Sequence, residues 1–217
     1  MSKDTPNVLD KTSILEESAQ PVFKEDQHGF LKQQNPQPYT YSVEYKQKQS
    51  TNSNMAWLRL GWLASQLPVN LLNTFSCVDI GSGNGAFIKE GQSVFKTIVP
   101  YDLCGESIEE ADLYDTNWDM IVLSDVLEHY PNIDDFWTLP FKYAMVSFPE
   151  TPRTGMNLSK WRHYKPDEHI YMLDSVNFVK WVQSHGAHIV AQGFPEDLIR
   201  KRWNSELPNI STFLIKR

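Results

Sequence analysis

Apolar and polar residues follow one another along the chain in blocks whose spacing predicts alternating helices and strands. Between Asn54 and Gln66 the apolar positions recur at helical spacing, and Pro68 ends this pattern. Further helices are expected at 69–73, 85–95, 134–143 and 175–185. Short apolar runs predict strands at Phe75–Ile80, Thr97–Tyr101, Met120–Ser124, Ala144–Phe148, Ala187–Ala191 and Ile210–Ile215. This alternation predicts an α/β domain with a mostly parallel sheet, whose last strand reverses direction.

The N-terminal quarter of the chain differs from the rest in composition. Residues 1–53 are polar, rich in Gln, Asn, Lys and Ser, and poor in aliphatic side chains. They would bury little apolar surface by themselves, so we expect an extension that forms a lid or is partly disordered. The main domain is expected to span residues 54–217. Tyr39, Tyr41 and Tyr45 of the extension either pack on this domain or cover a cationic ligand.

The stretch 75–87 ends an apolar run in three glycines and then becomes compatible with a helix. This order predicts a strand, a tight turn and a helix, because glycine lets the backbone turn sharply and approach a ligand closely. The free N–H groups of the helix would point into the same space, which favours a nucleotide-like ligand. Gly81, Gly83 and Ala86 fit the dinucleotide pattern G-x-G-x-x-G/A, and Asp102 lies at a suitable distance to hold a ribose.

A more restrictive pattern in the same turn, D-x-G-x-G-x-G, runs from Asp79 to Gly85. A second motif, D-V-L-E-H, runs from Asp125 to His129 after another predicted strand. On these two motifs the chain, from about Leu58 onward, resembles the class I S-adenosylmethionine-dependent methyltransferases, and within them the type 23 or ubiquinone O-methyltransferase-like subfamily. The resemblance implies a Rossmann-like three-layer sandwich and S-adenosyl-L-methionine as cofactor. The chain departs from the family in its shortened crossovers after Asp102 and after Pro131.

The resemblance also implies which residues would hold the cofactor. The glycine turn would bind the methionine end, and Asp125 would flank the transferred methyl group. Asp102 would accept hydrogen bonds from both ribose hydroxyls, or it caps a turn. A brief strand is expected at 111–113, where Asp112 or Leu113 would lie nearest the adenine. The predicted cofactor residues are Asp79, Gly81, Gly83, Gly85, Asp102, Asp112, Leu113 and Asp125.

The residues expected to meet the methyl acceptor follow the fourth and fifth strands. His129 is a candidate acid or base, because imidazole titrates near neutrality, or it caps the loop before Pro131. The subfamily carries a Glu-His pair after the fifth strand, which Glu168 and His169 match; the pair would act on the acceptor or tie the loop to the sheet. The predicted catalytic residues are His129, Glu168 and His169, and the predicted substrate-binding residues are Trp161, His163 and Tyr164. Metal binding by His163, Glu168 and His169 is considered, but no metal is expected.

Composition narrows the class of protein. With 41% hydrophobic and 22% charged residues, the chain is expected to be globular. A net charge of −7 argues against a duplex nucleic-acid partner, and the segment 200–202 is the candidate basic patch. Cys77 and Cys104 provide no disulfide framework. No apolar run approaches about 18 residues and the first residues are polar, so we expect no membrane span and a cytoplasmic location.

From these patterns we predict a methyltransferase that acts on a small, polar, sugar-like or hydroxylated metabolite by in-line transfer to oxygen or carbon. Three other hypotheses stay open. An NAD(P)-dependent oxidoreductase would use the same glycine turn, although Asp79 inside the strand argues against it. A non-catalytic binding or structural module would fit the shortened crossovers. A nucleic-acid methyltransferase is less expected, because the chain is acidic and carries no Asn/Asp-Pro-Pro-aromatic motif after the fourth strand.

Overall fold

A six-stranded sheet forms the centre of the molecule, which a computed structural model describes over residues 21–37, 53–103, 107–152, 157–200 and 208–217. Its strands are β3 (Ser76–Ile80), β4 (Thr97–Tyr101), β5 (Trp118–Ser124), β6 (Phe141–Pro149), β8 (His188–Gly193) and β9 (Ile210–Lys216). They lie in the order β4-β3-β5-β6-β9-β8. The first four are parallel, and β9 is antiparallel to both of its neighbours. The predicted α/β fold with a mostly parallel sheet and a reversed last strand is confirmed.

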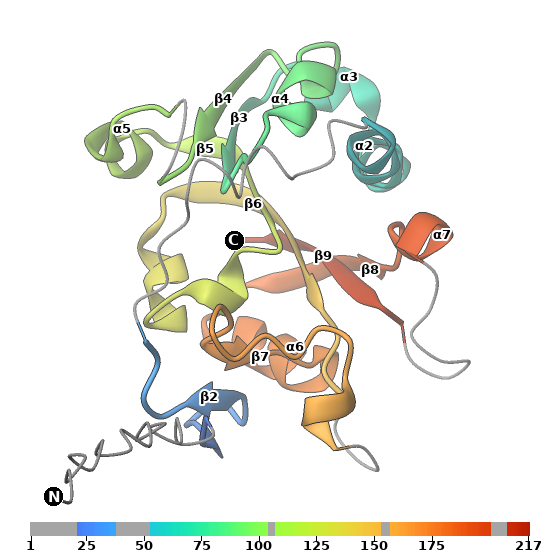
Figure 1. Cartoon of the computed structure of the whole chain (residues 1–217). Helices are drawn as coiled ribbons and strands as arrows, with labels where there is room; N and C mark the ends of the chain where they lie inside the picture. The colour runs from blue at the N-terminus through green and yellow to red at the C-terminus, as the bar shows by residue number, and fades with distance from the viewer. Residues whose placement is uncertain (1–20, 38–52, 104–106, 153–156, 201–207) are drawn as a thin grey trace, which may run out of the picture.

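Helices cover both faces of this sheet (Figure 1). One face is covered by α2 (Asn54–Gln66), α3 (Val69–Leu72) and α4 (Ala86–Gly91), and the other by α6 (Ser175–Ser184). In β5, Met120 and Val122 pack toward α2, whereas Ile121 and Leu123 pack toward α6, because successive side chains of a strand point to opposite faces. The other described helices include η3 (Leu158–Lys160) and α7 (Asp197–Arg200). Within the described ranges, no helix is long and apolar enough to cross a membrane.

Both shortened crossovers differ from the expected elements. The expected strand at 111–113 is wrong: the segment lies in helix α5 (Glu110–Asp115), which suits its strong helix formers Ala, Glu and Leu. The expected helix at 134–143 is also wrong. The chain forms a 3-10 helix there, η2 (Ile133–Thr138), and a second one, η1 (Leu127–His129), precedes it directly after β5. Pro140 cannot continue a helix, so β6 begins directly after it at Phe141 rather than at the predicted Ala144.

Part of the N-terminal extension packs on the main domain. Strands β1 (Phe23–Glu25) and β2 (Leu31–Gln33) form a hairpin, and β2 also pairs with β7 (Tyr171–Met172). Phe30 is fully buried, and its ring centroid lies 6.1 Å from that of Trp181 in α6. The side chain of Asn177 donates a 2.7 Å hydrogen bond to the carbonyl of Gly29. The tyrosines proposed as a lid lie outside the described residues, and the division at residue 53 stays a prediction.

The burial of Phe30 gives a test of whether the hairpin belongs to the folded core. Phe30→Ala is expected to lower the free energy of unfolding by about 3–5 kcal/mol, because it removes a buried ring and leaves a cavity. Denaturant unfolding of the full chain measures this change. Val22→Ala, at a side chain that is 53% exposed, is the control and should change stability by less than about 0.5 kcal/mol. A loss below about 1 kcal/mol for Phe30→Ala would show that the hairpin does not pack on the domain in solution.

Candidate functional site

Three glycines form the turn between β3 and α4. Gly81, Gly83 and Gly85 have φ angles of 72°, 56° and 74°, in the left-handed region that other residues rarely adopt. At Gly81, an added Cβ would lie 2.4 Å from Cγ2 of Val126, just beyond the end of β5. Glycine is therefore required at position 81 by conformation and by close packing. The predicted order of strand, tight turn and helix is confirmed, and cofactor binding by the turn stays a prediction.

Two carboxylates flank the turn. Asp102 follows β4, and its Oδ2 accepts a 2.8 Å hydrogen bond from the N–H of Gly83. Asp102 therefore caps the turn, as one of the two hypotheses required, and its role on the ribose stays a prediction. Asp79 lies inside β3 and is 4% exposed. Burial raises the pKa of Asp79 from 3.8 to about 7, while Arg59 opposes this rise and Asp102 adds to it.

Asp125 lies in an ion-pair network next to the turn. Its backbone is left-handed, with a φ of 56°. Its Oδ2 lies 2.9 Å from Nη2 of Arg200 and 3.7 Å from Nη2 of Arg59. The fully buried carboxylate of Glu196 joins both arginines, at 2.6 Å from Arg59 and 2.8 Å from Arg200. Burial acts to raise the pKa of Asp125, but Arg200 and Arg59 outweigh it, so this pKa lies below its usual value.

His129 and His169, two of the predicted catalytic residues, lie side by side. Their ring centroids are 4.9 Å apart, in an edge-to-face arrangement. The Nδ1–H of His129 donates a 2.8 Å hydrogen bond to the carbonyl of Glu168. Burial lowers the pKa of His129, and burial together with His129 and Lys165 lowers the pKa of His169 to about 3. Both imidazoles are therefore neutral near pH 7, the form that accepts a proton or binds a Lewis acid.

Glu128 belongs to the same cluster. Its side chain is 2% exposed, and within the described part of the chain neither carboxylate oxygen has a hydrogen-bond partner. Burial, followed by the charge of Asp125, raises the pKa of Glu128 well above its usual value. Glu128, His129 and His169 each have one atom that could bind a metal ion, and these three atoms lie within 4.8 Å of one another. The structure thus groups His169 with Glu128 and His129, rather than with the His163 and Glu168 considered from the sequence.

The predicted substrate-binding residues occupy different environments. Trp161 is 4% exposed, which leaves little of its ring for an acceptor. The Nε2 of His163 forms a hydrogen bond with the Oδ1 of Asn209, and burial lowers the pKa of this histidine. The ring of Tyr164 is half-buried, with its centroid 6.1 Å from that of Phe23 in β1. Substrate binding by these three residues stays a prediction, which the burial of Trp161 does not support.

Glu168 reaches the cluster through its backbone. Its carbonyl holds His129, whereas its carboxylate Oε2 lies 3.0 Å from Nζ of Lys165. The next N–H in the loop after His169, that of Ile170, donates a 2.9 Å hydrogen bond to the carbonyl of Glu128. The hypothesis was that the Glu168–His169 pair ties the loop to the sheet, and these hydrogen bonds reach η1 after β5 rather than a strand, so a tie to the sheet itself stays a prediction. A catalytic role for its carboxylate stays a prediction.

The two candidates for the adenine lie on helix α5. Leu113 is 2% exposed and belongs to the core, and its carbonyl accepts a 3.0 Å hydrogen bond from the indole of Trp118. Asp112 is exposed on the same helix. Adenine contact by either residue stays a prediction, and the burial of Leu113 weighs against it.

Three charged residues of this region were not selected from the sequence, Arg59, Glu128 and Glu196, and Arg200 was considered only as part of a basic patch. Arg59 interrupts an apolar helix between two leucines, which is a signal that could have been used. Its partner Glu196, whose Oε1 accepts from its Nε at 2.7 Å, is 137 residues away, and no local pattern joins two positions so far apart. Glu128 stood inside the D-V-L-E-H motif, but nothing in the sequence indicated its burial.

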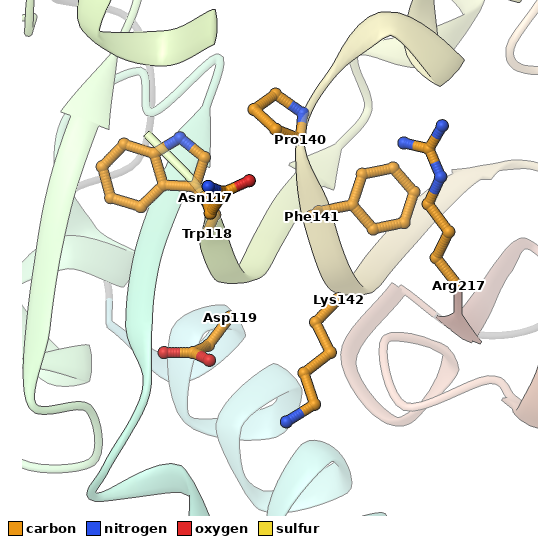
Figure 2. Close-up of a pocket in the computed structure, with 7 residues that line it drawn as sticks. All are labelled: Asn117, Trp118, Asp119, Pro140, Phe141, Lys142 and Arg217. Carbon is orange, nitrogen blue, oxygen red and sulfur yellow. The ribbon is translucent and has the colours of Figure 1, made fainter. Parts of the chain in front are cut away.

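A cavity of about 470 Å³ lies at the opposite edge of the sheet (Figure 2). It is lined by Asn117, Trp118, Asp119, Pro140, Phe141, Lys142 and Arg217. These residues surround the amino ends of β5 and β6, whereas the glycine turn follows the carboxyl end of the parallel strand β3. Open α/β sheets bind their cofactors at the carboxyl ends, so this cavity is not the expected cofactor site.

The raised pKa of Asp79 predicts how stability depends on pH in the absence of cofactor. Between about pH 4 and 7 the folded protein keeps a proton that the unfolded chain has lost, so stability falls as pH rises through this range. Asp79→Asn removes this pH dependence. The free energy of unfolding of the variant, relative to that of the parent, should therefore rise by a few kcal/mol from pH 5 to pH 8, at about 1.4 kcal/mol per pKa unit. Denaturant unfolding at both values measures the difference, with Asp115→Asn, an exposed carboxylate, as control. Equal pH dependence of Asp79→Asn and the parent would contradict the raised pKa.

Comparisons with known proteins agree with this geometry. Residues 49–192 match the family described as a methyltransferase domain. Magnesium protoporphyrin IX methyltransferase from Synechocystis PCC 6803, solved with bound S-adenosylhomocysteine, is 15% identical, with a TM-score of 0.54 over 83% of this chain and 90% of that chain. A methyltransferase from Leishmania major is 14% identical, with a TM-score of 0.53 over 90% and 96% of the two chains. One from Archaeoglobus fulgidus is 13% identical, with a TM-score of 0.53 over 76% and 95%.

At these sequence identities the solved structures establish only the fold. The family match establishes that the chain is a member of the methyltransferase family. None of the curated protein sequences compared with the chain matches it significantly. The family match spans both the glycine turn and the D-V-L-E-H motif, and the family uses S-adenosylmethionine. The chain therefore belongs to the class I S-adenosylmethionine-dependent methyltransferases.

Proposed function

We propose that this protein transfers the methyl group of S-adenosylmethionine to an oxygen or carbon atom of a small, polar, hydroxylated or sugar-like metabolite. The observation that carries the proposal is the cluster of neutral imidazoles, His129 and His169, at the carboxyl edge of the sheet. Val126 packs against Gly81, so the motif that bears His129 adjoins the glycine turn. A methyl donor on the turn and an acceptor at the imidazoles would share one space.

Methyl transfer to a hydroxyl requires that the reacting atoms are aligned and that the hydroxyl loses its proton. A hydroxyl oxygen attacks the methyl carbon, the carbon–sulfur bond breaks, the sulfonium becomes a neutral thioether, and the hydroxyl proton leaves. Holding the reacting atoms in line can supply about 7–11 kcal/mol of the barrier. Of the two imidazoles, His129 is the one that can take the proton directly, because a pKa of about 3 makes His169 a weak base near neutral pH.

Charge pairing at this edge favours a neutral acceptor over a nucleic acid. Arg59 and Arg200 are each bound to the carboxylates of Glu196 and Asp125. Cations engaged in this way are poor partners for a phosphate backbone, which needs several basic groups along its path. The net charge of −7 acts in the same direction and favours a cationic cofactor.

Cofactor binding is tested by calorimetric titration of the full chain with S-adenosylmethionine, S-adenosylhomocysteine and NADH. Asp102→Ala is expected to weaken binding of the first two by roughly 10–150-fold, because hydrogen bonds to a charged acceptor contribute about 1.5–3 kcal/mol. Asp102→Asn keeps an oxygen that can accept from the N–H of Gly83. This variant therefore distinguishes loss of the turn's hydrogen bond from loss of the ribose contact. Asp115→Asn is the control. Unchanged affinity in Asp102→Ala would reject the ribose assignment, and binding of NADH alone would favour an oxidoreductase.

Acceptor chemistry is tested by the rate of S-adenosylhomocysteine formation with a panel of hydroxylated metabolites. His129→Ala and His169→Ala are expected to lower turnover by about 10²–10⁴-fold, as for loss of a group that handles the proton, and to leave cofactor affinity nearly unchanged. His188→Ala, at an exposed imidazole of β8, is the matched control. Equal losses of turnover and of affinity would make the two histidines structural. Cofactor binding without turnover on any acceptor would support the non-catalytic module instead.

A further inference from the structure

The segment between β8 and α7 buries a carboxylate that the proposed methyl transfer does not use. Glu196, which directly precedes α7, is fully buried. Its Oε1 accepts from the Nε of Arg59 at 2.7 Å, and the Nη2 of the same guanidinium lies 2.6 Å from that oxygen. Burial of a carboxylate is costly unless a cation pairs with it, so the contact with Arg59 is what holds Glu196 in place.

Helix α7 presents its apolar side chains to solvent. Leu198 and Ile199 are 78% and 48% exposed, whereas Glu196 is fully buried just before them. A surface helix normally does the reverse and buries its apolar side. Polar contacts therefore hold α7 on the domain, rather than apolar burial. A segment of this kind opens at a lower free energy than the core, because it loses few buried apolar contacts.

Two ion pairs attach the segment to the rest of the domain. One joins Glu196 to Arg59 of α2, and the other joins Arg200 of α7 to Asp125 at 2.9 Å. Oε2 of Glu196 also lies 2.8 Å from Nε of Arg200, but within the described residues neither atom has a partner in hydrogen-bond geometry. Since Glu196 and Arg200 lie on the same segment, their contact does not hold it to the domain.

Arg59 links this segment to the glycine turn. It projects from α2, which packs on the same face of the sheet as Cys77 of β3. Asp79 points to that face as well, because alternate side chains of a strand share a face. The charge of Arg59 acts on the carboxyl group of Asp79, two residues before Gly81. The guanidinium that Glu196 occupies therefore lies near the turn that is expected to hold the methionine end of the cofactor.

The charges around Arg59 alternate in sign, which suits a zwitterion. Oδ2 of Asp125 lies 3.7 Å from Nη2 of Arg59. Oδ1 of Asp125 is buried, and within the described parts of the chain it has no hydrogen-bond partner. The methionine end of S-adenosylmethionine carries one ammonium and one carboxylate. The ammonium can donate to Oδ1 of Asp125, and the carboxylate can pair with Arg59 where Glu196 now does.

We propose that Glu196 is an internal competitor of the cofactor: its carboxylate fills an anion site on Arg59 and is displaced by the carboxylate of S-adenosylmethionine. The carboxylate of Asp197 accepts hydrogen bonds from the N–H groups of residues 209 and 210, which keep α7 attached when Glu196 leaves. Competition lowers the apparent affinity by the fraction of molecules in which Glu196 is released. The inference rests on the proposed function, because it places the methionine end of the cofactor at the glycine turn.

A permanent structural ion pair would bury Glu196 in the same way, but it predicts the opposite effect on binding. Removing one partner of a permanent buried pair leaves the charge of Arg59 uncompensated and disturbs the site around it, so ligand affinity would fall. Removing a competitor leaves the same guanidinium available to the ligand, so affinity would rise. The sign of the change in affinity therefore separates the two roles.

The test is calorimetric titration of the full chain with S-adenosylhomocysteine and with 5′-methylthioadenosine, which lacks the amino-acid carboxylate. Glu196→Gln is expected to tighten binding of S-adenosylhomocysteine by at least about 5-fold and to change that of 5′-methylthioadenosine by less than about 2-fold. Glu196→Asp keeps the charge but shortens its reach, so it should tighten binding of S-adenosylhomocysteine to a smaller extent. Glu25→Gln, at an exposed carboxylate of β1, is the matched control and should bind both ligands as the parent does.

Each outcome decides the inference. Unchanged or weaker binding of S-adenosylhomocysteine by folded Glu196→Gln would overturn it, as would equal tightening for both ligands. Circular dichroism and the thermal midpoint show whether Glu196→Gln folds, and Glu196→Asp decides if it does not. Loss of folding in both variants would assign the ion pair to stability and overturn the inference.

The same measurements separate this inference from the proposed function. If the parent binds S-adenosylhomocysteine and Glu196→Gln does not bind it more tightly, the inference fails and the proposed function stands. Tighter binding by Glu196→Gln without turnover on any acceptor would support the inference and reject the proposed function. If the parent and the variants bind neither ligand, both are rejected.

Discussion

The contact between Gly81 and Val126 is the constraint on which the rest of the site depends. Parallel pairing of β3 with β5 brings the carboxyl ends of both strands to one edge, where a Cβ at position 81 would lie 2.4 Å from Val126. The turn can therefore approach the end of β5 only without a side chain. This approach places Asp125 and the 3-10 helix with His129 beside the glycine turn. The absence of a side chain at position 81 thus lets the expected cofactor turn lie against the segment proposed to meet the acceptor.

Three buried carboxyl groups at this edge differ in how the free-energy cost of removing them from water is offset. Glu196 is fully buried and is bound by both Arg59 and Arg200. For Asp79, the positive charge of Arg59 opposes the effect of burial, and burial still raises the pKa to about 7. For Glu128, the ion-pair contact found within the described parts of the chain is the imidazole of His129 at 4.0 Å. An unpaired buried charge costs several kcal/mol, so Asp79 and Glu128, which have less cationic compensation than Glu196, hold a proton more readily and their pKa values are raised.

Because the crossovers are short, other parts of the chain cover apolar surface of the domain. Between β4 and β5 the described chain forms only the short helix α5, and between β5 and β6 it forms two 3-10 helices. The α6 face gains apolar cover from the N-terminal hairpin, since Phe30 packs on Trp181. The hairpin also pairs with β7, directly after the loop that carries His169. Its packing therefore supports the position of the loop that carries His169 as well as the stability of the core.

Local patterns determined the elements, and long-range packing determined the site. The strand and glycine turn from Ser76 to Gly85 could be predicted because a short, continuously buried apolar run followed by left-handed glycines leaves a signature within a few residues. The segment of Leu113 was misjudged because six residues carry too little periodicity to separate helix from strand. The helix expected at 134–143 was wrong because Pro140 inside it cannot continue a helix. Sequence alone also selected His129 and His169, from a motif and from a resemblance. Only the tertiary structure decided that Glu128 completes their cluster and that Arg59 meets Glu196, because burial and charge pairing depend on residues far apart in the chain.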